Sequence, residues 1–240
     1  MRRPEPARLA RSALLLGLAV LIAKLFVTGQ MALYMSPALD PLTALAAVLL
    51  AAMGVFELRG ARQGHPEPSG TDQTLTYLLV LVPLLLGLFV APRALGSSAL
   101  GGENISSLIV GFARQASPTP AVVATQPIED VGDLLAFLRR AGEGGLGQHV
   151  HAIGLVARGG DLEPNEFVLL RYSIVHCVAD ARPIALLVVA PGEVAWQTDQ
   201  WVEIDGSLGS RERGGDRLVS IIADRIVPTD EPTNPYLSAI

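Results

Sequence analysis

The residues best suited to chemistry in this sequence lie in the segment 171–183, which reads Arg-Tyr-Ser-Ile-Val-His-Cys-Val-Ala-Asp-Ala-Arg-Pro. It places the single cysteine of the chain, Cys177, next to His176 and three residues before Asp180. Imidazole and thiolate are good ligands for zinc and copper, and a carboxylate can complete such a site. Adjacent residues of a regular strand point to opposite faces, so His176 and Cys177 share one ion only if the strand bends there.

Two further histidines, His149 and His151, extend this candidate site. The predicted strand 149–157 pairs antiparallel with the predicted strand 167–175, and a hairpin between them brings His149 opposite about Val175. The candidate ion is zinc or copper, and the complete set of candidate ligands is His149, His151, His176, Cys177 and Asp180.

Other interpretations of these residues remain open. A single cysteine in an apolar strand is most often a small core residue. Asp180 is also suited to forming a turn, or to pairing with Arg171 or Arg182. A Cys177 nucleophile with His149 as its base has neither an oxyanion hole nor an activating motif around it, so we expect no enzymatic activity.

The elements that position these residues divide into a membrane half and a water-soluble half. Half of the residues are hydrophobic and 17% are charged, which is too apolar for an ordinary soluble domain, and nearly all of the excess precedes Pro92. Three apolar runs, at 13–35, 41–58 and 75–91, fall within the length range of a membrane-spanning helix. The sequence therefore predicts three transmembrane helices.

The arginines predict an orientation for these helices. Four arginines precede the first run, none separates the first run from the second, and two separate the second from the third. Because cytoplasmic loops carry an excess of Lys and Arg, we expect a multi-pass protein of the inner (plasma) membrane with a cytoplasmic N-terminus. The predicted parts are a transmembrane anchor at 1–92, a juxtamembrane linker at 93–126 and an extracytoplasmic domain at 127–240.

The extracytoplasmic domain is predicted to begin with an amphipathic helix at 128–140. Short strands follow at 149–157, 167–175, 184–189, 201–208 and 218–226. Five short strands favour a small closed barrel of the OB type, because closure removes exposed sheet edges. The predicted fold class is therefore membrane α plus all-β, with three transmembrane helices followed by a small five-stranded OB-like barrel.

The charge of the predicted domain excludes one function that OB folds often have. From Arg93 onward there are 11 Lys and Arg against 18 Asp and Glu, a net charge of −7. This charge repels the phosphates of a nucleic acid. We therefore expect no nucleic-acid partner.

The segment 171–183 resembles the Arg-Phe-x-Ile-x-Cys-Cys-x-Ala-Asp-Ala-x-Pro signature of the YcgQ-like family of membrane permease subunits. The resemblance extends to residues 27–30, 34–37, 82–87, 201–206 and 235–236. It implies that this chain is the smaller component of a two-component complex with a larger, polytopic permease. One departure from the signature matters: His176 replaces the first cysteine of the family's pair, so a disulfide within the pair is impossible here.

The apolar run 13–35 contains one charged residue, Lys24, about midway along it. An unpaired charge at that depth is costly, so either a partner subunit or polar cavity supplies a counter-charge, or the span is shifted and Lys24 lies nearer an interface. We expect a non-enzymatic accessory subunit that lies in the lipid bilayer and presents its extracytoplasmic domain to a polytopic permease. The alternative is a membrane-anchored extracytoplasmic module that binds a transition metal.

Overall fold

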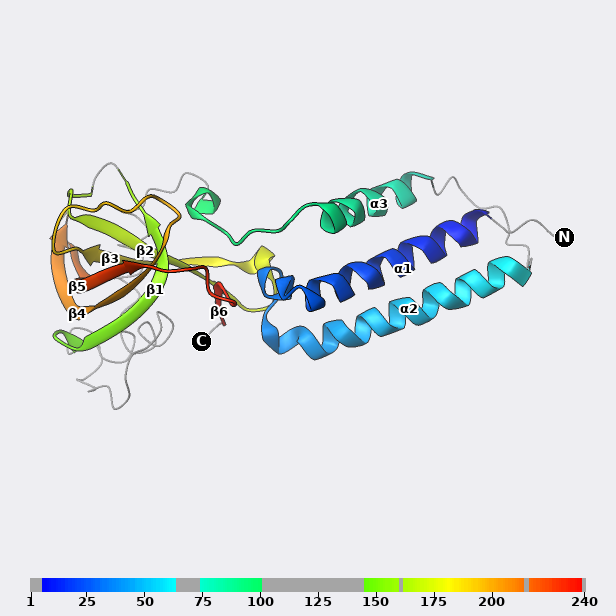
Figure 1. The fold of residues 1–240 in the computed structure, drawn as a ribbon, viewed down its shortest axis with the longest axis horizontal. Coiled ribbons are helices and arrows are strands. Elements are labelled where there is room, and N and C mark those ends of the chain that lie inside the picture. Colours follow the sequence, from blue (N-terminus) through cyan, green and yellow to red (C-terminus); the bar gives the residue numbers. More distant parts are fainter. Residues whose placement is uncertain (1–5, 64–73, 101–144, 160–161, 214–215, 239–240) are drawn as a thin grey trace. The chain divides into compact units, whose positions relative to one another are not determined.

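The structure is a computed structural model, and it describes residues 6–63, 74–100, 145–159, 162–213 and 216–238 (Figure 1). The chain divides between Arg93 and Ala94 into two compact units, a helical unit before this point and a sheet unit after it. The predicted helix 128–140 and most of the predicted linker 93–126 lie outside the described residues.

The helical unit contains α1 (Pro6–Val27), α2 (Asp40–Gln63) and α3 (Thr74–Phe89), with 3₁₀ turns at Gln30–Leu33 and Pro37–Leu39. Among the described residues, Ala7–Val27 and Pro37–Ala61 are long and apolar enough to cross a membrane. The apolar part of α3, Tyr77–Phe89, is shorter and contains Pro83. Two or three helices are thus candidates to span a membrane, where the sequence predicted three.

The first helix ends earlier than the sequence predicted. It stops at Val27, and Gly29 follows in a left-handed conformation with φ 70°, which terminates a helix readily. Lys24 therefore lies in the last turn of α1, where its Nζ donates to the carbonyl oxygens of Gly87 (3.3 Å) and Leu88 (2.7 Å) in the last turn of α3. These carbonyls have few partners within their own helix and carry the negative end of its dipole. Lys24 thus finds hydrogen-bond acceptors within the chain, at the end of α3.

Contacts at both ends of α1 define the directions of its neighbours. Near its start, the Arg11 Nε donates to the Tyr77 hydroxyl of α3 at 3.2 Å, and near its end Lys24 contacts the end of α3, so the two helices run parallel. Ser12 near the start of α1 donates to the Gly54 carbonyl oxygen in the second half of α2 at 2.8 Å, so α1 and α2 run antiparallel. Figure 1 shows α1 lying alongside both helices. The three helices therefore alternate in direction along the chain.

Glycines allow α1 to pack closely on its neighbours. A Cβ added at Gly17 would lie 2.8 Å from the Leu84 side chain, and one at Gly54 would lie 2.8 Å from the Leu16 side chain. One added at Gly87 would lie 3.1 Å from a leucine of α1. Real Cβ atoms are not accommodated at the two shorter distances, so leucine side chains already fill these helix contacts.

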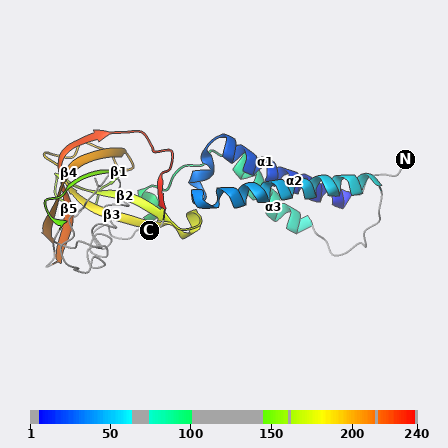
Figure 2. The same cartoon turned by 90° about the horizontal axis from the view of Figure 1, so that it is seen from below.

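The sheet unit contains β1 (His149–Ala157), β2 (Glu166–Ile174), β3 (Arg182–Val189), β4 (Trp201–Arg213), β5 (Asp216–Pro228) and β6 (Tyr236–Ser238). Each of the five strands predicted from the sequence is present at the expected place. The sixth was missed, because three residues are too few to show an alternating pattern. The described strands form a six-stranded mixed sheet rather than the predicted set of five, and Figure 2 shows how strongly they curve.

The strand pairings run in a closed cycle. β1 pairs antiparallel with β4 over residues 149–155 and with β2 over residues 155–157. β2 pairs antiparallel with β3, β3 parallel with β5, and β5 antiparallel with β4. β6 adds to β2 in parallel. Each of the first five strands thus has two neighbours within the cycle, and β2 has β6 as a third.

Two apolar clusters lie on the two faces of the curved sheet. In β2, Phe167 and Leu169 belong to one cluster, and the alternating Val168 and Leu170 belong to the other. The strand β2 is therefore buried on both faces, as the uninterrupted apolar run 167–170 within it requires. The second cluster also takes in partly buried Leu95, Leu100 and Leu162 from outside the strands.

A β-bulge interrupts the β4–β5 pairing next to Asp205. Asp205 pairs with Arg225 and Gly206 pairs with Ala223, so β5 contributes one extra residue there. A Cβ added at Gly206 would lie 2.3 Å from the Ile222 carbonyl oxygen. Only glycine therefore fits at this bulge without displacing the backbone of β5.

We predict that Gly206→Ala destabilises the sheet unit by about 1–3 kcal/mol, because the new methyl group overlaps backbone atoms that cannot rotate away. Thermal unfolding of the detergent-solubilised protein, followed by tryptophan fluorescence, measures the change, since both tryptophans lie in the sheet unit. Gly192→Ala is the matched control, because a Cβ added at Gly192 meets nothing within 4 Å. Equal unfolding temperatures for the two variants would contradict the conclusion that only glycine fits at this bulge.

Candidate functional site

The segment after β2 forms a short loop organised by Asp180. The loop contains the 3₁₀ turn η5 (Val178–Asp180), and the Asp180 carboxylate accepts hydrogen bonds from the backbone N–H groups of Val175 (2.9 Å), His176 (2.9 Å) and Cys177 (3.3 Å). These bonds, the Val175 bond first, lower the pKa of Asp180 below its ordinary value. Asp180 therefore acts as a turn former, one of the roles expected from the sequence.

The two side chains proposed as metal ligands in this loop are accessible. His176 is 71% exposed, and its Nδ1 lies 3.3 Å from an Asp180 oxygen. Cys177 is a free, partly buried cysteine. Of the five candidate ligands, the structure brings His176, Cys177 and Asp180 together in this loop, while His149 and His151 lie on β1.

The predicted pairing of His149 with the end of β2 is wrong. The described pairing of β1 with β2 covers only Leu155–Ala157, and His149 pairs with Ser207 of β4 instead. The alternation of exposed and buried residues in the first part of β1 places His149 and His151 on its outer face. The neighbours of the two histidines are thus set by β4.

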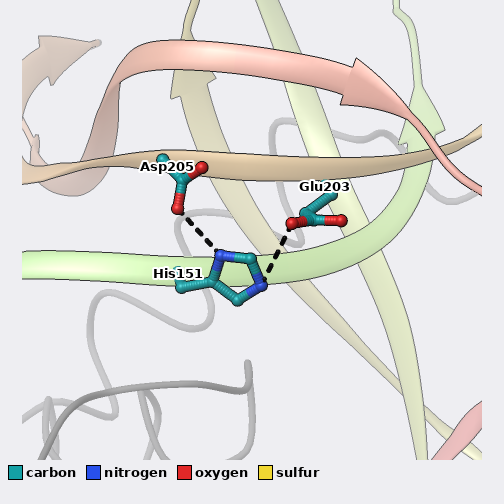
Figure 3. A group of neighbouring side chains, drawn as sticks. All are labelled: His151, Glu203 and Asp205. Atoms are coloured by element: carbon teal, nitrogen blue, oxygen red, sulfur yellow. Dashed lines mark hydrogen bonds and ion pairs between the residues drawn. The ribbon is translucent and has the colours of Figure 1, made fainter.

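His151 lies between two carboxylates of β4 (Figure 3). Its Nδ1 is 2.8 Å from Asp205 Oδ1, and its Nε2 is 3.7 Å from Glu203 Oε1. His151 and Asp205 are direct cross-strand partners, and Glu203 precedes Asp205 by two residues on the same face of β4. Among the described residues, these three form a group whose potential ligand atoms all lie within 4.8 Å of one another.

The electrostatics of this cluster favour the charged form of Asp205. The hydrogen bond from His151 lowers the pKa of Asp205 most, and the charges of His151, Arg225 and His149 lower it further. The three side chains of the cluster are each about one third exposed, so water and ions reach them. Of these three residues, only His151 was predicted from the sequence. The pattern that could have revealed Glu203 and Asp205 is the alternation His-x-His on one strand and Glu-x-Asp on another.

Arg171, the first residue of the signature segment, is buried with 5% exposure. Its guanidinium donates to the carbonyl oxygens of Ile153 (3.0 Å), Asn234 (3.3 Å) and Pro235 (3.1 Å). It also lies over the Trp201 ring, 5.3 Å from the ring centroid. Arg171 therefore joins β1, the start of β4 and the segment before β6.

Two tyrosines fix the start of the sheet unit onto the sheet. The Tyr172 hydroxyl donates to the Gly96 carbonyl oxygen at 2.9 Å, and the Leu95 N–H donates to the Tyr236 hydroxyl at 3.1 Å. Burial first, and then the charges of Asp199 and Tyr236, raise the pKa of Tyr172 to about 12. Tyr172 thus stays a protonated donor at physiological pH. The first residues of the predicted juxtamembrane linker belong to the sheet unit.

The fold and the cluster define a class: a membrane-associated protein whose apolar helices precede a mixed-sheet domain with a histidine and two carboxylates on its surface. The DUF1980 N-terminal domain matches residues 10–106 and the DUF1980 C-terminal domain matches residues 134–238. Together they cover most of the chain, which therefore belongs to the DUF1980 family.

A curated relative supports the resemblance to the YcgQ-like family. The UPF0703 protein YcgQ of Bacillus subtilis (strain 168) is 32% identical over 65 residues, which are 27% of this chain and 23% of that protein. The match spans less than a quarter of that relative's length, so the relative supports the family and assigns no activity to this chain.

We predict that Arg171→Met destabilises the sheet unit by about 3 kcal/mol, because three carbonyl oxygens in buried or partly buried hydrogen bonds lose a donor. Arg171→Lys should recover only part of this, since an ammonium cannot reproduce the planar guanidinium fork. Denaturant unfolding followed by tryptophan fluorescence provides the measurement. Arg182→Met is the matched control, because Arg182 belongs to the same segment and is exposed. Equal destabilisation by Arg171→Met and Arg182→Met would contradict the conclusion that Arg171 joins these segments.

We predict a pH-dependent loss of order in the loop at Asp180. Because the pKa of Asp180 is lowered in the folded state, the carboxylate stabilises the loop fully above its unfolded pKa, roughly 4. That contribution is lost as the pH falls through the folded pKa. Hydrogen exchange of the peptide spanning Val175 to Cys177, corrected for intrinsic rates, should be faster in Asp180→Asn than in wild type at neutral pH. The difference in exchange rate between wild type and Asp180→Asn should vanish in acid. A difference that does not change with pH would contradict the conclusion that the Asp180 carboxylate orders this loop.

Proposed function

We propose that this protein is a non-enzymatic accessory subunit of a two-component membrane permease, and that it presents its sheet unit outside the cytoplasm to a polytopic partner. The resemblance of the sequence to the YcgQ-like family is what suggests this role, and the match to the UPF0703 protein YcgQ supports that resemblance. The arginine distribution of the sequence supports the orientation. The protein then contributes a binding surface, and its partner contributes the transport pathway.

The close packing of the helical unit carries this proposal. At Gly17 and Gly54 the helices approach so closely that an added Cβ would lie 2.8 Å from the Leu84 and Leu16 side chains, which would have to shift to make room for it. A transport pathway built on discontinuous helices and internal repeats needs more spans than this unit offers, and polar cavities between them. A tightly packed anchor of at most three helices suits a subunit that attaches to a pathway built by another chain.

The helix directions support three spans rather than two. α3 is short for a span, yet it runs parallel to α1 and antiparallel to α2, as the third crossing of an up-down-up anchor does. The Lys24 ammonium lies at the ends of both α1 and α3, where a charged group in an interface costs less than at mid-membrane. With three crossings and a cytoplasmic N-terminus, the sheet unit lies outside the cytoplasm.

The cycle of strand pairings supports an OB-like barrel for the sheet unit. Each of β1 to β5 has a partner on both sides, which is the condition for a sheet to close on itself. One of the two apolar clusters takes alternating residues from the strands, including Val150, Phe167, Val188, Ile204 and Ile221, as the interior of a small barrel does. The bulge at Gly206 supplies the local bend that closure needs.

We predict that α2 contacts the partner, because its outer face carries large apolar side chains that no other described helix covers. Leu45 is 54% exposed and Phe56 is 73% exposed, whereas Leu84 in α3 is 5% exposed. A photo-cross-linking amino acid placed at Leu45 or Phe56 in the native membrane should yield an adduct with one polytopic membrane protein. The same amino acid at Leu84 is the control and should yield no adduct with another chain.

A reciprocal experiment makes this test specific. Tagging the captured polytopic protein should recover this chain in a fixed ratio, and deleting this chain should lower the partner's activity or abundance. Absence of any polytopic adduct at both exposed positions would sink the proposal. That result would favour the alternative, a free-standing membrane-anchored module that binds a transition metal.

A further inference from the structure

We propose that His151 and Glu203, with Asp205 behind the imidazole, bind a divalent first-row transition ion of the zinc type on the outer face of β1 and β4. One imidazole and carboxylate oxygens form a donor set of borderline hardness, which suits zinc(II). Because this set has no thiolate, it differs from the Cys177 site predicted from the sequence. The inference goes beyond the proposed function, since an ion would bind here with or without a partner subunit.

The contacts of the two imidazole nitrogens indicate how the ion is held. Nδ1 of His151 is 2.8 Å from Asp205 Oδ1, a hydrogen-bond distance, so Nδ1 carries the proton that it donates to this carboxylate. In the neutral ring Nε2 then presents a lone pair, and it faces Glu203 Oε1 at 3.7 Å. Two acceptors that face each other repel unless a cation lies between them.

The separation of these two acceptors fits an ion. Ligand atoms about 2.1 Å from a tetrahedral ion lie about 3.4 Å apart, and at most about 4.2 Å apart. The observed 3.7 Å between Nε2 and Oε1 falls within this range, so an ion requires only small rotations of His151 and Glu203. Asp205 then fixes the tautomer and the orientation of the ring, as carboxylates commonly do behind metal-bound histidines.

A further protein ligand is within reach. His149 lies two residues before His151 on the same face of β1, and its side chain is exposed. Its cross-strand partner is Ser207, so it lies beside the cluster on the same pair of strands. Rotation of the His149 side chain would bring a second imidazole to the ion, and water would complete the coordination.

The charges around the cluster leave an attraction for a cation. Glu203 and Asp205 contribute two negative charges, and Arg225, the cross-strand partner of Asp205, contributes one positive charge. With neutral histidines, one negative charge remains uncompensated among these groups. The site also rests on rigid backbone, because β1 and β4 pair continuously from His149 to Leu155. Its ligands are therefore positioned before the ion arrives.

The competing interpretation is a protonated His151 that forms ion pairs with both carboxylates and binds no metal. Zinc binding separates the two interpretations directly. The full-length protein is purified in detergent without a histidine tag, stripped with a chelator, and titrated with zinc chloride against a chromophoric chelator at neutral pH. Wild type should bind one zinc ion per chain at this site, and excess calcium or magnesium should not displace it.

Substitutions assign the binding to these residues. His151→Ala should abolish the binding, the isosteric Glu203→Gln should weaken it at least tenfold, and Asp205→Asn should weaken it about 10–100-fold through the orientation of the ring. The double variant His176→Ala, Cys177→Ser is the matched control and should bind as wild type does. The near-ultraviolet circular dichroism of each metal-free variant checks that the sheet unit is folded.

Two results would overturn the inference. One is a wild-type protein that binds no zinc in the titration. The other is binding that survives His151→Ala and Glu203→Gln but is lost when His176 and Cys177 are replaced, which would assign the ion to the loop at Asp180. Neither result bears on the cross-linking of α2, so failure of the ion site and failure of the proposed subunit role are distinguishable.

Discussion

A buried guanidinium holds the sheet unit together where several chain segments meet. Arg171 lies in β2, but it donates to Ile153 of β1 and to Asn234 and Pro235 before β6, and it lies over Trp201 at the start of β4. A charged group with 5% exposure has lost most of its hydration, and only several hydrogen bonds offset that loss. If one of these segments shifted, the buried guanidinium would lose hydrogen bonds that offset its lost hydration. The register of β1 therefore depends on Arg171.

The change of partner along β1 determines which chemistry the histidines can perform. Leu155 pairs with both β2 and β4, and the residues before it follow β4 alone. The second part of β1 is buried on both faces, whereas the first part alternates between buried and exposed residues. His151 therefore lies on an accessible face and meets Asp205 and Glu203 instead of the Cys177 loop.

Local patterns in the sequence were sufficient to place the strands and to pair β1 antiparallel with β2, but not to show that this pairing covers only Leu155–Ala157 or that the histidines pair with β4. Five strands were predicted correctly because alternation and continuous apolar runs are local signals, and three-residue β6 has no such signal. The carboxylates at 203 and 205 were missed because they lie some fifty residues from His151, and sequence order favoured the adjacent strand as its partner. The end of α1 was misplaced because one glycine, Gly29, outweighed the apolar residues after it. The contact of Lys24 with α3 is equally non-local.

The signature segment combines residues that the fold uses with residues that it leaves accessible. Arg171 joins strands, Tyr172 fixes the start of the sheet unit, and Asp180 orders three backbone N–H groups. His176 is 71% exposed, and its Nδ1 lies 3.3 Å from an Asp180 oxygen. Side chains that packing does not require are those available to another molecule. Because Asp180 holds this loop and β4 holds His151, a substitution in either place leaves the backbone of the other intact.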